Sequence, residues 1–89
     1  MAIYLITYDL NNPGQKHNQV LTAIKEFPAW ARLSESSYAV DSTSTSKQIF
    51  DYLAVHIDKN DTLLVITLSL PYYGQASKEV IDWLSNGLK

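Results

Sequence analysis

The sequence predicts one small α+β domain covering residues 1–89, and three observations predict it. The length of 89 residues is that of a single domain. Residues 2–9 and 62–70 are largely apolar on both sides of a strand, which is typical of the central strands of a sheet. Amphipathic segments at helical spacing lie between and after them. A hydrophobic content of 46% with 18% charged residues also indicates a globular chain and excludes a disordered one.

The first helix is predicted directly after the first strand. Asn12 suits the N-cap, and Pro13 suits the first helical position, where its missing N–H has no partner to lose. Apolar residues recur at helical spacing as far as Phe27. Pro28 cannot continue a helix, so we expect this helix to end near residue 27.

Two shorter strands and two further helices follow. Residues 29–34 and 37–41 read as strands, and the polar connection 34–37 predicts a hairpin between them. Thr45 and Gln48 have the spacing of a capping box at the start of a second helix, whose apolar stripe extends to Ile57. Pro71 breaks the pattern after the last strand, and residues 77–88 read as a third helix.

This order of elements is that of a ferredoxin-like βαββαβ sandwich with a third helix at the C-terminal end. The topology places two helices on one face of a four-stranded antiparallel sheet and leaves the other face bare. Because that face is apolar in this sequence, the third helix or a second subunit should cover it. We expect a homodimer in which the third helix contributes to the contact.

Composition excludes several classes of function. The absence of Cys excludes disulfides, thiolate nucleophiles and cysteine zinc sites. The formal charge of −2 argues against a surface built for duplex DNA, because such binding depends on Lys and Arg. No signal peptide or bilayer-length apolar segment is visible, so we expect a cytoplasmic protein without a membrane partner. His17 and His56 have no second ligand at helical spacing and are expected on the solvated surface.

Asp9 is the sharpest candidate for chemistry, because it stands where an apolar strand ends. Two copies of Asp9 across a dimer axis could hold one Mg²⁺ ion and activate water, which makes this residue a candidate catalytic and metal-binding group. The alternative is a turn in which Asp9 accepts hydrogen bonds from the backbone of Asn11 and Asn12. The sequence favours the turn, since no second acid lies nearby.

A first set of candidate phosphate ligands lies at the start of the first helix. Its free N–H groups, the backbone around Gly14 and the side chains of Asn11, Asn12 and Lys16 could hold an anion there. The simpler interpretation of Asn-Pro-Gly is that it only starts the helix.

A second set decorates the predicted hairpin. Arg32 with the hydroxyls of Ser34 and Ser36 could hold a phosphate, and Tyr38 or Trp30 could stack on a base. For Trp30, a place in the core is the favoured interpretation.

Residues 4–9, with the sequence Tyr-Leu-Ile-Thr-Tyr-Asp, resemble the first strand of the small CRISPR adaptation protein family. Residues 12–15, Trp30 and residues 33–38 are more similar to uncharacterised short bacterial and phage proteins described as SinR-like. The resemblance implies a ferredoxin-like dimer and, from some members, a divalent metal at Asp9 with nuclease activity. Other members bind duplexes, but the arginine-rich first helix of that family is missing here. We therefore do not expect a role in CRISPR adaptation.

These observations favour non-catalytic binding of a phosphate-bearing ligand, a nucleotide or short nucleic acid, at a site shared by two subunits. Sequestering of a nucleotide signal is one form of this function, and it needs no cofactor. One alternative is a metal-dependent phosphodiesterase that uses Asp9 and Mg²⁺. The other is a protein-interaction module that uses the apolar face of the sheet.

Overall fold

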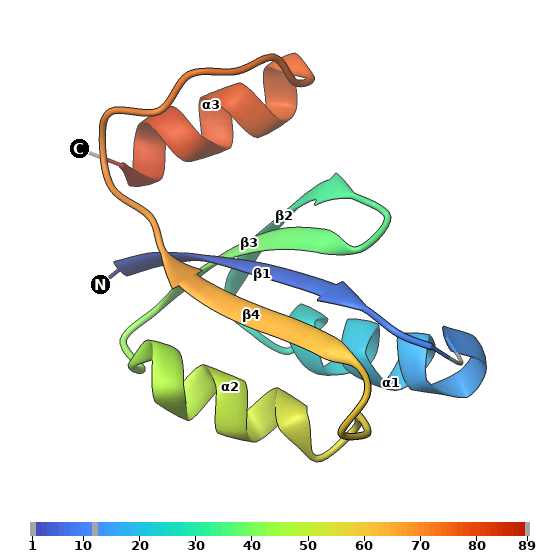
Figure 1. Cartoon of the computed structure of the whole chain (residues 1–89). Helices are drawn as coiled ribbons and strands as arrows, with labels where there is room; N and C mark the ends of the chain where they lie inside the picture. Colours follow the sequence, from blue (N-terminus) through green and yellow to red (C-terminus); the bar gives the residue numbers. More distant parts are fainter. Residues whose placement is uncertain (1, 12, 89) are drawn as a thin grey trace.

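The computed structural model describes residues 2–11 and 13–88 (Figure 1). Its elements are β1 (Ala2–Asp9), α1 (Pro13–Lys25), β2 (Ala29–Ser34), β3 (Ser37–Ser42), α2 (Ser46–Ala54), β4 (Thr62–Thr67) and α3 (Lys78–Gly87). The predicted α+β class is confirmed, while Asn12, the predicted N-cap, lies outside the described residues. Among the helices of the described residues, none is both long and apolar enough to cross a membrane.

The four strands form one antiparallel sheet in the order β2-β3-β1-β4. This order is compatible with a ferredoxin-like arrangement. In the centre of the sheet, Leu5 lies opposite Ala39 on one side and Ile66 on the other. The β2–β3 register shifts between Arg32 and Ser34. Strands β2 and β4 are therefore the two edges, and only the β2 edge carries an irregularity.

Element boundaries differ from the predicted ones at two places. Helix α1 ends at Lys25, because the N–H groups of Glu26 and Phe27 form tight turns to the carbonyls three residues earlier. The backbone before Pro28 disfavours the helical conformation, which explains the early end. Strand β4 ends at Thr67 and not at residue 70. The N–H of Leu68 still donates to Ile3 O at 2.9 Å, after which the chain leaves the sheet toward α3.

The predicted capping box of α2 is confirmed. Thr45 Oγ1 accepts from the N–H of Gln48 at 3.1 Å, and Gln48 Oε1 accepts from the N–H of Thr45 at 2.8 Å. Ser77 caps α3 in a related way, by accepting from the N–H of Val80 at 3.3 Å. Both helices therefore begin where a polar side chain satisfies backbone donors.

Helices α1 and α2 cover one face of the sheet and α3 lies over the other (Figure 1). The first face and its two helices share the main core, whose buried residues are Tyr4, Ile6, Tyr8, Leu10, Val20, Ala23, Ile24, Tyr38, Val40, Ile49, Leu53 and Leu63. The second core is smaller and consists of Ile3, Ala39, Val80, Leu84 and Leu88.

Helix α3 covers only part of the second face. Ile3 and Ala39 are buried beneath it, while its predicted contribution to a dimer contact stays a prediction. On β4, Leu64 and Ile66 remain 52% and 44% exposed. An apolar strip along the β4 edge is thus left uncovered in the single chain.

Candidate functional site

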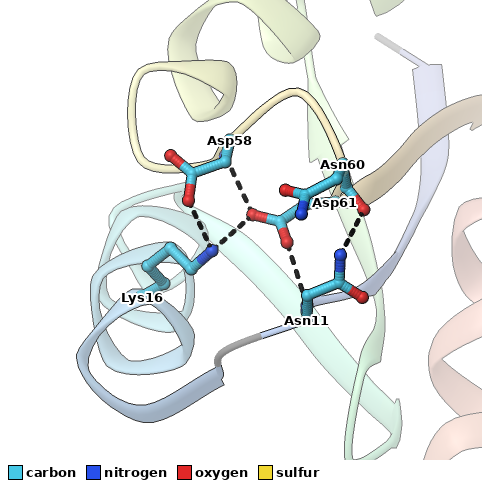
Figure 2. Close-up of polar contacts among 5 residues, drawn as sticks. All are labelled: Asn11, Lys16, Asp58, Asn60 and Asp61. Atoms are coloured by element: carbon cyan, nitrogen blue, oxygen red, sulfur yellow. Dashed lines mark hydrogen bonds and ion pairs between the residues drawn. The ribbon is translucent and has the colours of Figure 1, made fainter.

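A polar network joins the start of α1 to the turn that precedes β4 (Figure 2). Lys16 Nζ lies 2.8 Å from Asp61 Oδ2 and 2.9 Å from Asp58 Oδ2. The N–H of Asn11 donates to Asp61 Oδ1 at 2.9 Å, and Asn11 Nδ2 donates to Asn60 O at 2.9 Å. The network therefore ties the β1–α1 connection to the α2–β4 connection.

Asp61 is the centre of this network. Its side chain has 0% exposure, and its Oδ2 also accepts from the N–H of Asp58 at 2.8 Å. Donation from the Asp58 N–H, followed by Lys16 and the Asn11 N–H, lowers the pKa of Asp61 from 3.8 to about 2. The hydrogen bonds that the Lys16 ammonium group donates, to Asp61 first and then to Asp58, raise the pKa of Lys16. The network, with one ammonium group and two carboxylates, holds two loops together.

This network changes how the first set of candidate phosphate ligands is interpreted. Asn11 and Lys16 are both engaged in it, so the only side-chain cation of the set already has two carboxylate partners. Gly14 has φ 19° and ψ −121°, which are not helical values, so the first turn of α1 is not regular. Asn12 lies outside the described residues. The structure brings Asn11 and Lys16 together around carboxylates, where an anion would be repelled.

Asp9 is exposed at the end of β1, opposite Thr62 of β4. The turn predicted as the alternative to a metal site is wrong for Asn11, because the N–H of that residue donates to Asp61. Within residues 2–11 and 13–88, no group of three or more His, Cys, Asp or Glu side chains is placed to hold a metal ion. Asp9 therefore belongs to no such group within these residues.

The second set of candidates lies at the other edge of the sheet, where the β2–β3 hairpin meets the end of β1 (Figure 1). The N–H of Tyr8 donates to Ser36 O at 3.1 Å, which fixes the hairpin against β1. Arg32 lies opposite Tyr38 in the register of β2 and β3. The ring of His17, from α1, lies 5.6 Å from the ring of Tyr8. We call Tyr8, His17, Arg32 and Tyr38 the hairpin-end cluster.

The Tyr8 hydroxyl is the unusual group of the hairpin-end cluster. Tyr8 is only 4% exposed, and its buried hydroxyl has no hydrogen-bond partner among the described residues. Burial, followed by the nearby Tyr38, raises the pKa of Tyr8 to about 12, against the opposing effect of the Arg32 guanidinium. Tyr8 is therefore a neutral hydrogen-bond donor at neutral pH, and a buried donor without an acceptor is destabilising.

Arg32 supplies positive charge beside this hydroxyl. The side chain is exposed, and its recorded hydrogen bond is a long one, from Nε to Ser34 O at 3.4 Å. Among the described residues, the ion pairs within 4.0 Å involve Lys16, Lys47 and Lys78, and none involves Arg32. The guanidinium is thus available to an external anion.

An aromatic side chain extends the cluster along β2. Trp30 is 37% exposed, so the favoured prediction of a core position is wrong. The reason is that β2 is an edge strand, so no further strand of the described sheet lies beyond it. The Trp30 ring lies 6.1 Å from that of Tyr38, and Lys25 Nζ lies 5.3 Å from the centre of the Trp30 ring. An exposed aromatic group, with a second cation beside it, therefore lies two residues from Arg32 on β2.

The structure thus brings Arg32, Tyr38 and the Ser36 backbone together, and it adds Tyr8 and His17, which the sequence-based reasoning did not select. His17, expected to be solvated, is half-buried against Tyr8. Tyr8 could have been selected only by knowing that β3 separates β1 from β2.

No known protein family matches this sequence, and no curated protein matches it either.

Proposed function

We propose that this protein binds a phosphate-bearing ligand, a nucleotide, at the hairpin-end cluster. One observation carries the proposal: within the described residues, the buried Tyr8 hydroxyl has no acceptor, and the nearby Arg32 guanidinium has no carboxylate within 4.0 Å. A phosphate group supplies the acceptor oxygens and the negative charge that these two donors lack.

An incoming phosphate meets Arg32 before Tyr8. The Tyr8 oxygen is closed off from solvent, whereas Arg32 is exposed and makes one long hydrogen bond. The guanidinium can turn onto the phosphate and form charge-assisted hydrogen bonds, and the Tyr8 hydroxyl must become exposed before it can donate to the same phosphate. Trp30, exposed beside Tyr38, then offers a face on which a base can stack.

The charge distribution favours a compact ligand over a duplex. The whole chain has a formal charge of −2, and half-buried Lys16 is already paired with two carboxylates. Lys25 and Arg32 can neutralise only a few phosphates, so few counterions would be released on duplex binding. A nucleotide needs no more than one guanidinium, one hydroxyl and one aromatic face.

A cavity elsewhere in the molecule does not fit a phosphate. This cavity, of about 480 Å³, lies between the end of α1 and the start of α2. Its lining includes the Glu26 carboxylate, which accepts a hydrogen bond from Tyr52, and it includes no Lys, Arg or His. A carboxylate without a neighbouring cation repels a phosphate.

Calorimetry across mono-, di- and cyclic nucleotides, beside a DNA duplex, tests the proposal. We expect Arg32→Ala to weaken nucleotide binding by about 1.5–3 kcal/mol, the worth of hydrogen bonds to a charged group. Lys47→Ala is the matched control, because Lys47 is an exposed cation on α2 paired with Asp51. Tight, steeply salt-dependent duplex binding without a nucleotide signal would overturn the proposal, as would equal nucleotide binding by both variants.

The metal-dependent phosphodiesterase remains the alternative, and it rests on Asp9 and the resemblance to the CRISPR adaptation and SinR-like proteins. Hydrolysis assisted by a metal ion usually uses more carboxylates than one. We expect little or no nuclease activity with Mg²⁺ or Mn²⁺. Robust cleavage that disappears in Asp9→Asn, with the fold intact, would favour this alternative over binding.

We also propose that the fold is ferredoxin-like and that two copies associate along β4. The β4 segment has no charged residue and no Pro, and Leu64 and Ile66 are exposed on it. Natural edge strands usually carry such protective features, so an edge without them is suited to pairing. Because β2 lies at the opposite edge, each subunit would carry its own hairpin-end cluster. This revises the expectation of a site shared between subunits.

A further inference from the structure

A second unusual polar group lies on the opposite face of the sheet, beneath α3. Asp41, on β3, is opposite Ile3 of β1 and Ala29 of β2. Within residues 2–11 and 13–88, its buried Oδ1 atom accepts no hydrogen bond. Among these residues, no Lys, Arg or His lies within 4.0 Å of its carboxylate. The described part of the chain thus leaves a half-buried carboxylate without compensation, which is destabilising.

Asp41 lines a cavity of about 200 Å³ between the sheet and the end of α3. The other lining residues are Ile3, Ala29, Trp83, Asn86 and Gly87. Asn86 and Gly87 are exposed, so the cavity opens to solvent at the end of the helix.

Gly87 sets how closely the helix approaches the sheet at this cavity. A Cβ atom at Gly87 would lie 2.8 Å from Ile3 Cδ1, which is closer than atoms pack. The absence of a side chain therefore lets the end of α3 come down onto β1 and form one wall of the cavity.

The lining fits an organic cation better than a metal ion. A hard cation such as Ca²⁺ needs about 6–8 oxygen ligands, and Mg²⁺ needs octahedral geometry. Here the side-chain oxygens are those of Asp41 and Asn86, while Ile3 and Trp83 are apolar. A guanidinium or ammonium group can donate to a carboxylate while its alkyl part lies against apolar and aromatic surface. The volume is below the ~300–1,000 Å³ of typical small-molecule pockets, which limits the occupant to the size of one side chain.

We propose that this cavity binds an alkyl guanidinium or ammonium group, which donates to the Asp41 carboxylate and packs its alkyl part against Ile3 and Trp83. The group can belong to a free small amine or to an Arg or Lys side chain of a partner protein. The site is independent of the hairpin-end cluster, which faces the other side of the sheet and takes a ligand of opposite charge.

Titration with methylguanidinium, followed by the indole N–H resonance of Trp83, tests the site. We expect saturable shifts at Trp83, at least a tenfold loss of affinity in Asp41→Asn, and no binding of methylurea, the neutral analogue. Asp51→Asn is the matched control, because Asp51 is an exposed acid on α2. Ala29→Leu, which fills the cavity without changing the carboxylate, should also abolish the shifts.

A blocked tripeptide with a central Arg separates the two sources of the cation. Tighter binding of the peptide than of methylguanidinium supports the site and assigns a partner's side chain, whereas binding of methylguanidinium alone supports the site and assigns a free amine. Absence of saturation by methylguanidinium at millimolar concentrations, or equal affinity in Asp41→Asn and wild type, would overturn the proposal.

Discussion

Two tyrosines on β1 face the same core but differ in what their hydroxyls contact. Tyr4 donates to Ser44 O at 2.6 Å, while the Tyr8 hydroxyl has no partner. A satisfied buried hydroxyl stabilises a fold and an unsatisfied one destabilises it. Replacing either tyrosine by phenylalanine removes one oxygen atom, so the two variants separate an effect on binding from an effect on stability.

Tyr8→Phe should raise the free energy of unfolding by about 1 kcal/mol, because it removes a buried donor that has no acceptor. The same change should weaken nucleotide binding by about 1 kcal/mol, since the donor is then missing in the complex. Tyr4→Phe is the control and should lower stability by a similar amount without affecting binding. Urea unfolding and calorimetry measure both quantities. A loss of stability in Tyr8→Phe equal to that in Tyr4→Phe would contradict the proposed role.

Asp61 should make stability sensitive to acid. Its pKa is lowered from 3.8 to about 2 on folding, so the stabilisation is complete above pH 3.8 and is lost as pH falls toward 2. Asp61→Asn should be less stable at neutral pH and should show a flatter dependence between pH 4 and 2. Urea midpoints measured across this range check the expectation, with Asp51→Asn as an exposed control. Parallel curves of urea midpoint against pH for wild type and Asp61→Asn would exclude Asp61 as the source of the acid sensitivity.

At the scale of elements, the two edge strands are protected in different ways. Strand β2 has a shifted register near Arg32, and α3 packs against it. Strand β4 has neither feature and exposes Leu64 and Ile66. Exposed apolar edges of this kind favour pairing with another strand.

Ile66→Lys should therefore convert a dimer into a monomer, because it places a charge in the proposed contact. Light scattering at micromolar concentration should report about twice the mass of one chain for wild type and one chain for the variant. Val55→Lys is the matched control, since Val55 is 78% exposed at the end of α2, outside the β4 strip. A monomeric wild type, or equal dissociation by both variants, would contradict pairing along β4.

The elements themselves were largely predictable from local signals. The capping box at Thr45, the hairpin before Tyr38 and the start of α3 after Ser77 each depend on residues close together in the chain. The ends of α1 and β4 were harder to predict. Pro28 disfavours the helical conformation in the residue before it, and β4 ends early because the chain leaves the sheet toward α3.

At the scale of the whole molecule, the candidate sites depend on contacts that sequence patterns do not encode. Lys16 meets Asp61 across 45 positions of the chain, which removes it from the predicted anion site. Arg32 acts on the pKa of Tyr8 because the strand order β2-β3-β1 brings the two residues to the same end of the sheet. Whether Trp30 is buried likewise depended on β2 being an edge. The residue types were visible in the sequence, but their partners were set by topology.

The most direct test of nucleotide binding at the hairpin-end cluster is chemical-shift mapping of backbone amides during titration with the best ligand from the calorimetric panel. We predict that the largest shifts lie at Tyr8, His17, Arg32 and Tyr38, and that they disappear in Arg32→Ala. Shifts centred on residues 11–16, or no saturable shift with any nucleotide, would contradict binding at this cluster.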